Sequence, residues 1–153
     1  MKNKLNCIML IDDDEEDNFF HQIVIKEMNI TEHVEVVLDG EEAMKFLTKE
    51  NQTQPDLIFL DINMPKMNGW EFLESYKKLN AEHKAKVVVV MLTTSTNPDD
   101  KKRAEQFSEI VAFNSKPLTE EMVKEVLDRY FPDIESKWET HLPQNSTTAL
   151  LHY

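Results

Sequence analysis

The sequence predicts a doubly wound α/β fold, in which five flanking helices cover a five-stranded parallel sheet. Short apolar runs alternate five times with segments of helical periodicity, as in a chain of βα units. The apolar runs are continuous, which is typical of parallel strands that are buried on both faces. Right-handed crossovers between such strands place helices on both sides of the sheet. The 153 residues suffice for one domain with a single core.

The first part of the chain supplies three strands and two helices. Apolar runs predict strands at 6–11 (NCIMLI), 34–38 (VEVVL) and 57–60 (LIFL). Helical spacing of apolar residues predicts helices at 17–28 and 40–50. The residues at this spacing are Phe19, Phe20, Ile23, Val24 and Met28 in the first helix and Ala43, Met44 and Leu47 in the second. We expect these faces to pack on the sheet.

The second part of the chain supplies the other two strands and three helices. Asn97, which Pro98 follows, and Thr119 are residue types that favour the N-terminal cap of a helix. The predicted elements are strands at 86–92 (KVVVVML) and 110–113 (IVAF) and helices at 69–79, 97–107 and 119–131. The expected apolar stripes are Trp70, Leu73 and Tyr76 in the first of these helices and Met122, Val123, Val126, Leu127 and Tyr130 in the last.

The alternation of strands and helices stops after Phe131. Residues 132–153 contain two prolines and few periodic apolar residues, so we interpret them as a C-terminal tail without an output domain. The folded domain is expected to span 4–131. The tail could dock on it through apolar residues, which are Ile134, Trp138 and Leu142.

The composition excludes several classes of function. A net charge of −12 argues against direct binding to nucleic acid, which requires clustered Lys and Arg. No apolar run approaches the ~20 residues that span a bilayer, and the N-terminus lacks the features of a signal peptide. The single cysteine, Cys7, rules out an internal disulfide. We therefore expect a cytoplasmic protein that binds neither membranes nor nucleic acid.

Polar residues that follow the first, third, fourth and fifth predicted strands should meet at one edge of the sheet. Asp12 and Asp13 follow the first strand, Asp61 follows the third, Thr93 the fourth, and Lys116 comes shortly after the fifth. Clustered carboxylates need a cation, and a set of hard oxygen ligands favours Mg²⁺. A carboxylate beside such a metal can attack phosphorus and form an acyl phosphate. The lysine and the hydroxyl could then contact the oxygens of the transferred group.

Four segments together resemble the receiver domain of bacterial two-component response regulators. They are MLIDDDEEDN, LIFLDINMPKMNGWEFL, VVVVMLTTSTNPDD and NSKPL. The resemblance runs from about Lys4 to Phe131 and is greatest to receivers of the stand-alone type. It implies the flavodoxin-like strand order 2-1-3-4-5. A departure is the segment before the last strand, AEQFSEIVAF, which lacks the usual glycine.

The resemblance implies a metal site for Mg²⁺ and a phosphoacceptor. Asp61 matches the aspartate that accepts the phosphoryl group. Asp12 and Asp13 match the acid pair, with Asp13 a direct ligand of the metal and Asp12 acting mainly through water. Asn63 matches the residue whose backbone carbonyl binds the metal.

The resemblance also implies the residues that respond to phosphorylation. Thr93 matches the switch hydroxyl, and Lys116 matches the lysine that pairs with the phosphoryl group. The Lys116–Pro117 bond is often cis in this family. Phe113 falls where an aromatic residue rotates inward on activation.

The function implied is a single-domain response regulator rather than an enzyme. A histidine kinase or a histidine phosphotransfer protein would donate the phosphoryl group to Asp61. The signal would pass to a downstream protein target by direct contact, by phosphorelay, or through a homodimer formed by 97–107, 110–113 and 119–131. One alternative is an aspartate-nucleophile phosphatase, which would carry a second Asp where Asn63 stands. The other is a degenerate receiver that serves only as a binding scaffold.

Simpler interpretations of single residues stay open at this point. The acidic run at 12–17 also suits the N-terminus of a helix, with Asp14 as the cap and Asp17 as its partner at the third helical position. Thr94 beside Thr93 leaves the assignment of the hydroxyl open by one position. The histidines show no metal-ligand spacing and are given no role.

Overall fold

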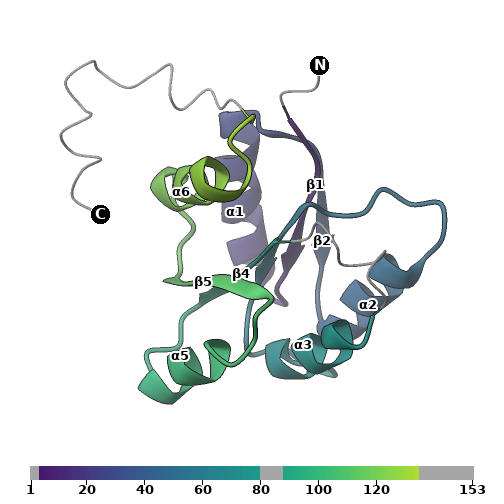
Figure 1. Cartoon of the computed structure of the whole chain (residues 1–153), viewed down its shortest axis with the longest axis vertical. Coiled ribbons are helices and arrows are strands. Elements are labelled where there is room, and N and C mark those ends of the chain that lie inside the picture. The colour runs from purple at the N-terminus through teal and green to yellow at the C-terminus, as the bar shows by residue number, and fades with distance from the viewer. Residues whose placement is uncertain (1–3, 80–87, 135–153) are drawn as a thin grey trace.

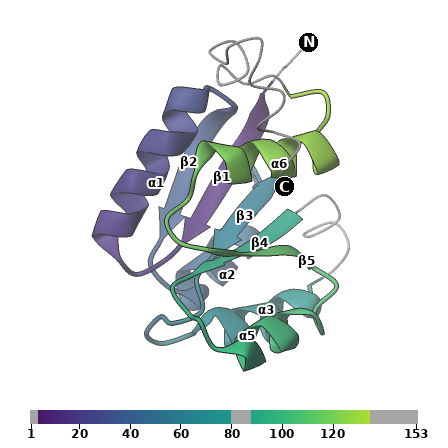
Figure 2. The ribbon, with the colours of Figure 1, turned by 90° about the vertical axis from the view of Figure 1, so that its left-hand side faces the viewer.

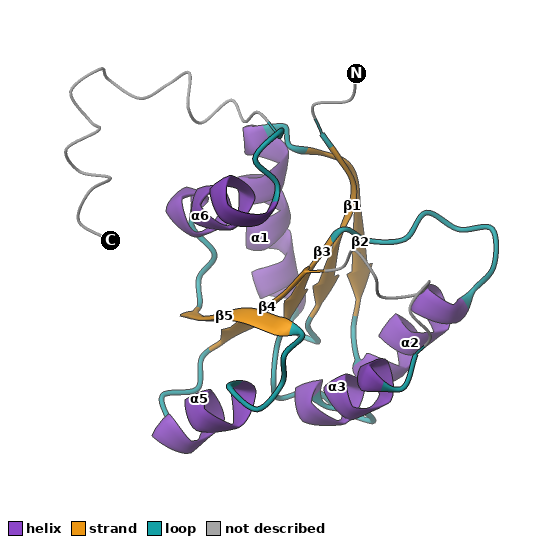
Figure 3. Ribbon diagram, in the orientation of Figure 1, coloured by secondary structure: helices purple, strands orange, loops and turns teal. Residues whose placement is uncertain are grey.

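The computed structural model describes residues 4–79 and 88–134 and shows five parallel strands in one sheet, in the order β2-β1-β3-β4-β5. The strands are β1 (Leu5–Ile11), β2 (Thr31–Val37), β3 (Leu57–Leu60), β4 (Val88–Thr93) and β5 (Ile110–Ser115). The helices are α1 (Glu15–Met28), α2 (Gly40–Thr48), α3 (Gly69–Lys77), α5 (Pro98–Ala104) and α6 (Glu120–Tyr130). Strands and helices alternate along these residues (Figure 3). The predicted fold and strand order are confirmed.

Helices cover both faces of the sheet (Figures 1 and 2). On one face, Met9 and Ile58 pack with residues of α2, α3 and α5. On the other face, Ile8 and Phe59 pack with residues of α1 and α6. Successive side chains of a strand point to opposite faces, so a strand covered on both sides must be apolar throughout. This is why all four residues of β3 are buried.

Local capping interactions determine where the helices begin. Side chains of Asp14, Asp39, Asn68, Asn97 and Thr119 each accept a hydrogen bond from a backbone N–H in the first turn of the helix that follows. Such caps satisfy donors that have no partner within the helix. The predicted caps Asn97, Thr119 and Asp14 are confirmed. No helix in the described part of the chain combines the length and apolarity needed to cross a membrane.

Several element boundaries differ from the predictions because pairing with a neighbouring strand extends beyond the apolar run. β2 begins at Thr31, which is paired with Leu5 of β1, and β5 continues to Ser115, which is paired with Thr93. The helices shift too: α1 begins at residue 15 rather than 17, while α2 and α5 end at residues 48 and 104. Residues 86 and 87 of the predicted fourth strand lie outside the described residues.

The predicted apolar face of the first helix is confirmed for Met28, which is buried, and for Val24, which packs against the cluster beneath α1 and α6, but it was wrong for three residues. Phe19 and Phe20 are 63% and 62% exposed, and Ile23 is exposed as well. The residues that α1 buries lie three or four positions apart along one face, and they are Asn18, His21, Ile25 and Met28. Phe19 and Phe20 form an edge-to-face pair on the opposite side of this helix from the sheet. In contrast, Ala43, Leu47, Trp70, Leu73 and Tyr76 are buried as predicted.

The first residues after α6 contact the domain. Ile134 packs against the apolar cluster beneath α1 and α6, and its N–H donates to the carbonyl of Phe131. The other predicted docking residues of the tail, Trp138 and Leu142, lie outside the described residues.

Candidate functional site

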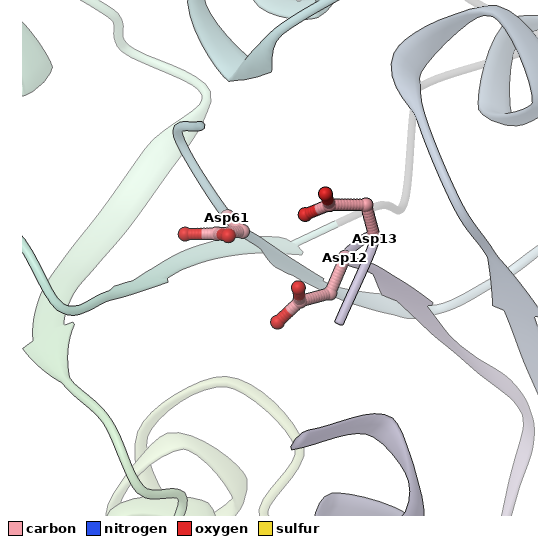
Figure 4. A group of neighbouring side chains, drawn as sticks. All are labelled: Asp12, Asp13 and Asp61. Carbon is pink, nitrogen blue, oxygen red and sulfur yellow. The ribbon is translucent and has the colours of Figure 1, made fainter. Parts of the chain in front are cut away.

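Three aspartates from two neighbouring strands meet at the carboxyl edge of the sheet (Figure 4). Asp12 and Asp13 follow β1, and Asp61 follows β3. The backbone N–H of Asp61 donates to the carbonyl of Ile11 at 3.0 Å, so strand pairing continues up to the acid. One carboxylate oxygen from each aspartate lies within 4.8 Å of the others. Parallel strands thus bring together acids that are far apart in the sequence.

Lys116 supplies the positive charge next to these acids. Its Nζ lies 2.6 Å from Asp12 Oδ2, 2.8 Å from Asp17 Oδ2 and 3.4 Å from Asp61 Oδ2. The side chains of Lys116, Asp12 and Asp61 are at most 10% exposed, so water screens these interactions weakly. The peptide bond from Lys116 to Pro117 is cis, as is often the case in the family that the sequence resembles.

Burial raises the pKa of the Asp61 carboxyl, and the negative charge of Asp12 raises it further. The charge of Lys116 and the N–H of Ile62, which donates to Asp61 Oδ1 at 2.8 Å, act in the opposite direction. For Lys116, burial lowers the pKa, but hydrogen bonds to Asp12 and Asp17 outweigh it and the net pKa is raised. Lys116 therefore stays charged at neutral pH, while the ionised Asp61 is held in an unfavourable environment.

The donor set fits a hard divalent cation. Three carboxylates lie close together, and Asp13 is exposed, which leaves access from the solvent. Within the part of the chain that the structure describes, the ammonium of Lys116 faces four acids, Asp12, Asp13, Asp17 and Asp61, which leaves a surplus of negative charge. Oxygen ligands and surplus negative charge favour ions such as Mg²⁺ or Mn²⁺.

Two residues of α1 contribute to the pocket that the sequence did not place there, Asp17, which was expected to bond to the helix cap, and His21, which had no expected role. Asp17 does not return a hydrogen bond to the cap, because its side chain instead binds Lys116. His21, one turn further along, is 2% exposed. Burial lowers the pKa of His21 against the opposing charges of Asp17 and Asp12, so the imidazole is neutral at pH 7. Asp17, His21, Ile25 and Met28 follow one another at intervals of three or four positions along the helix. This spacing is the signal in the sequence that could have predicted that both residues face the interior.

The remaining predicted residues surround the acids. Thr93 is fully buried at the end of β4, whereas Thr94 is exposed. The hydroxyl of Thr93 accepts a hydrogen bond from the N–H of Ser95, and its carbonyl accepts one from the N–H of Lys116. Phe113 is a half-buried residue of β5 that packs on the cluster beneath α2, α3 and α5. Asn63 lies exposed in the loop after Asp61.

Both glycines of the chain lie against the loop that follows Asp61. The N–H of Gly69 donates to the carbonyl of Ile62 at 2.8 Å, and that of Gly40 donates to the carbonyl of Met67 at 2.9 Å. A Cβ on Gly69 would lie 2.3 Å from the carbonyl oxygen of Asp61, and one on Gly40 would lie 2.9 Å from the carbonyl oxygen of Met67. These close approaches of backbone to backbone require glycine.

Replacing Gly69 by alanine is therefore expected to displace the backbone of Asp61. Overpacking of this kind costs about 1–3 kcal/mol of unfolding free energy, because the atom that a Cβ meets is a backbone carbonyl oxygen at 2.3 Å, which cannot rotate away. Urea unfolding would measure the loss. Glu74→Ala, at an exposed position of the same helix, is the control and should change stability by less than about 0.5 kcal/mol. Equal stability of Gly69→Ala and the wild type would contradict the close approach.

Comparison with known proteins connects this site to a family. Residues 8–128 match the family model described as the response regulator receiver domain. Response regulator Rcp1 from Synechocystis sp. is 39% identical over 102 residues, which are 64% of this chain and 68% of that protein.

Two crystal structures extend the comparison to the fold. The Mn²⁺-bound form of response regulator Rcp1 is 32% identical, with a TM-score of 0.67, and the match covers 80% of this chain and 92% of that one. The phosphorylated cyanobacterial phytochrome response regulator RcpA is 28% identical, with a TM-score of 0.71, and the match covers 86% of this chain and 97% of that one.

Proposed function

Because the chain belongs to the response regulator receiver domain family, we propose that it accepts a phosphoryl group on Asp61 and signals through the change that follows. The family acts in two-component signalling, and its members bind a divalent metal at an acidic pocket. The observation that carries the proposal is the position of Asp61 within 4.8 Å of Asp12 and Asp13 and 3.4 Å from Lys116.

Asp61 is suited to be the nucleophile. A carboxylate oxygen of Asp61 forms a bond to phosphorus while the bond from phosphorus to the donor breaks and its electron pair leaves with the donor. Strand pairing and the N–H of Ile62 hold the carboxylate in position. Lys116 balances the charge of the transferred oxygens, and the buried hydroxyl of Thr93 is suited to contact one of them.

Asp12, Asp13 and Asp61, together with the carbonyl of Asn63, would hold Mg²⁺. The ion would neutralise charge on the transferred oxygens. Mn²⁺ has the same ligand preferences, and the structure of Rcp1 was determined with it. Within this ligand set Asp13 is the exposed acid, whereas Asp12 also binds Lys116.

Asp13→Asn is expected to weaken Mg²⁺ binding at least about tenfold, because even changes outside the ligand shell of metal sites often cost about 10–100-fold. Isothermal titration calorimetry of the metal-free protein would measure the affinity. Asp14→Asn is the matched control, since it removes the adjacent charge from a residue whose side chain caps α1, and asparagine caps equally well. An affinity that Asp13→Asn leaves unchanged would exclude Asp13 as a ligand.

A protein donor is supported by the surface beside the pocket. Phe19 and Phe20 are exposed in the second turn of α1, two and three residues beyond Asp17, which contacts Lys116. Two neighbouring exposed aromatic residues at one place on a surface are typical of a protein interface. We propose that a histidine kinase or histidine phosphotransfer protein docks here when it donates to Asp61.

The output is proposed to leave through β5 and its flanking helices. Lys116 follows β5 directly, and its N–H binds the carbonyl of Thr93 at the end of β4. A shift of Lys116 or Thr93 toward a phosphoryl group would therefore act on β5, including Phe113, and on α5 and α6. Such a shift between two arrangements would present a changed surface to a downstream protein or to a second copy of the chain.

Intact-mass measurement tests the function directly. Incubation with acetyl phosphate and Mg²⁺ should add the mass of one phosphoryl group, and a protein that stays unmodified would overturn the proposal. The phosphatase alternative predicts many rapid turnovers of a small phosphoester such as p-nitrophenyl phosphate, whereas a receiver should release phosphate only slowly from its own aspartyl phosphate. The scaffold alternative predicts no mass gain.

A further inference from the structure

The contact between Asp17 and Lys116 joins two residues 99 positions apart in the chain. Asp17 lies in the first turn of α1, and its Oδ2 is 2.8 Å from Lys116 Nζ. This distance is shorter than the 3.4 Å that separates Lys116 from Asp61, the residue proposed to accept the phosphoryl group. Before phosphorylation, Lys116 is therefore held more closely by Asp17 than by Asp61.

The position of Asp17 is well defined by its surroundings. Asp14 caps α1 by accepting hydrogen bonds from the N–H groups of Glu16 and Asp17. The next residue, Asn18, is buried and donates to the carbonyl of Asp12 at 2.8 Å. The start of α1 is thus fixed both to its own cap and to the end of β1. These contacts fix the backbone of Asp17, whose short side chain therefore starts from a defined position beside Lys116.

The three N–H donors of the Lys116 ammonium face three acids: Asp12, Asp17 and Asp61. A phosphoryl group on Asp61 would raise the negative charge there to about −2 and add acceptor oxygens. The ammonium must then approach these oxygens and weaken one of its other contacts. Asp12 is 6% exposed, so loss of its counter-ion would leave a buried charge unpaired. Asp17 is 34% exposed, and water can replace the ammonium there.

We propose that Asp17 is a positioning residue that holds Lys116 before phosphorylation and releases it when Asp61 is modified. Asp17 thereby competes with the phosphoryl group for Lys116 and disfavours the phosphorylated arrangement. This inference rests on the proposed function, because it assigns a partner for Lys116 at the same site. It adds a residue of α1 to the set that determines how readily the protein is activated.

The experiment measures binding of beryllofluoride, a tetrahedral anion that binds carboxylate oxygen as a phosphoryl group does, in the presence of Mg²⁺. Asp17→Asn should bind it about two- to fivefold more tightly than the wild type, the range expected for loss of one partly exposed ion pair. Glu16→Gln is the matched control, because it removes one exposed acid from the same turn, away from the contact with Lys116. Its effect should be smaller than that of Asp17→Asn.

A Lys116→Gln background tests whether Asp17 acts through Lys116. There, Asp17→Asn should change the affinity no more than Glu16→Gln does. An effect of full size in this background would overturn the inference, as would unchanged or weaker binding by Asp17→Asn alone. If the wild type itself binds no beryllofluoride, the proposed function fails too, so the two failures are distinguishable.

A second readout needs neither metal nor anion. In the metal-free protein, nuclear magnetic resonance can follow the ammonium signal of Lys116, which hydrogen bonds protect from exchange with water. Asp17→Asn should accelerate this exchange, and Glu16→Gln should not. Equal exchange rates in the wild type and Asp17→Asn would show that Asp17 does not hold Lys116.

Discussion

Replacing Asp61 by asparagine is expected to abolish phosphorylation by acetyl phosphate in the presence of Mg²⁺. The carboxylate oxygen is the proposed nucleophile, and an uncharged amide of nearly the same shape can neither attack phosphorus nor provide the same charge to a metal. Intact-mass spectrometry would show the gain of one phosphoryl group in the wild type and no gain in the variant. Labelling that persists in Asp61→Asn would assign the acceptor to another residue.

Asp56→Asn is the matched control for this experiment. Asp56 stands directly before β3, whereas Asp61 stands directly after it, so the two acids lie at opposite ends of the same strand. The carboxylate of Asp56 accepts a hydrogen bond from the N–H of Asn6 at 2.7 Å, far along the strand from the acidic pocket. The control variant should gain the phosphoryl group as the wild type does.

Asp61→Asn should also be more stable than the wild type in metal-free buffer. The pKa of Asp61 is raised in the folded protein, so the folded state binds a proton more tightly than the unfolded chain does. The resulting destabilisation is absent below the unfolded pKa and develops as the pH rises through the folded pKa. At pH 7 the ionised Asp61 therefore costs stability, and Asp61→Asn should gain about 1 kcal/mol, comparable to one partly screened charge interaction. Urea unfolding would measure it, and a loss of stability would contradict the unfavourable environment.

Lys116→Met is expected to have the largest effect on stability. It removes the ammonium that Asp12, Asp17 and Asp61 share, while methionine retains most of the apolar stem. Removing one partner of a buried ion pair costs about 3–5 kcal/mol, because the remaining charge stays buried without compensation. We expect about 3 kcal/mol at pH 7, since Asp13 and Asp17 leave part of the pocket open to water. Phosphorylation should slow as well.

The pH dependence follows from the same charges. Without Lys116, the folded-state pKa of Asp61 should rise further, so the folded variant takes up protons that the unfolded chain does not. The stability difference between wild type and variant should therefore narrow as the pH falls from about 7 toward about 4. Mg²⁺ should also narrow it by supplying positive charge. If the difference in unfolding free energy between the wild type and Lys116→Met stays constant over this pH range, the variant loses stability through altered packing rather than through unpaired charge.

Lys124→Met is the control for both measurements on Lys116→Met, which are the loss of unfolding free energy and the change of that loss with pH. Lys124 also has a mostly buried side chain, but Asp128, one of the groups it contacts, is 62% exposed. Water can solvate the carboxylate that remains, so the cost should stay below about 1 kcal/mol and vary little with pH. An equal loss of unfolding free energy in Lys116→Met and Lys124→Met would contradict the claim that Lys116 stabilises the fold by pairing with the buried acids.

The order of strands and helices could be predicted from sequence, since it depends on local patterns. LIFL before Asp61 is apolar throughout because both faces of β3 are covered, and such a short continuous apolar run is typical of a buried parallel strand. Positions directly after the strands gather at one edge of the sheet by topology, so Asp12, Asp13 and Asp61 could be expected together without knowledge of any contact.

Tertiary packing decided which face of each helix turned inward. In α1, apolar residues occur on both sides, and the pattern favoured Phe19 and Phe20. The face of α1 that carries Ile25 and Met28 packs against the sheet. His21 lies on this face and is buried, whereas the two phenylalanines lie on the other face and are exposed. Periodicity cannot resolve such a case, because the free energy of burying a face depends on the surface it meets.

Residue types and their order determined the fold class, the strand order implied by the family and the acids at the sheet edge. Only the tertiary structure showed that Asp17 binds Lys116 and that Gly69 approaches the carbonyl of Asp61. Both contacts join segments that are distant in sequence or depend on tenths of an ångström in backbone position. Local sequence patterns encode the preference of a segment for helix or strand, whereas such contacts arise only when all the segments pack together.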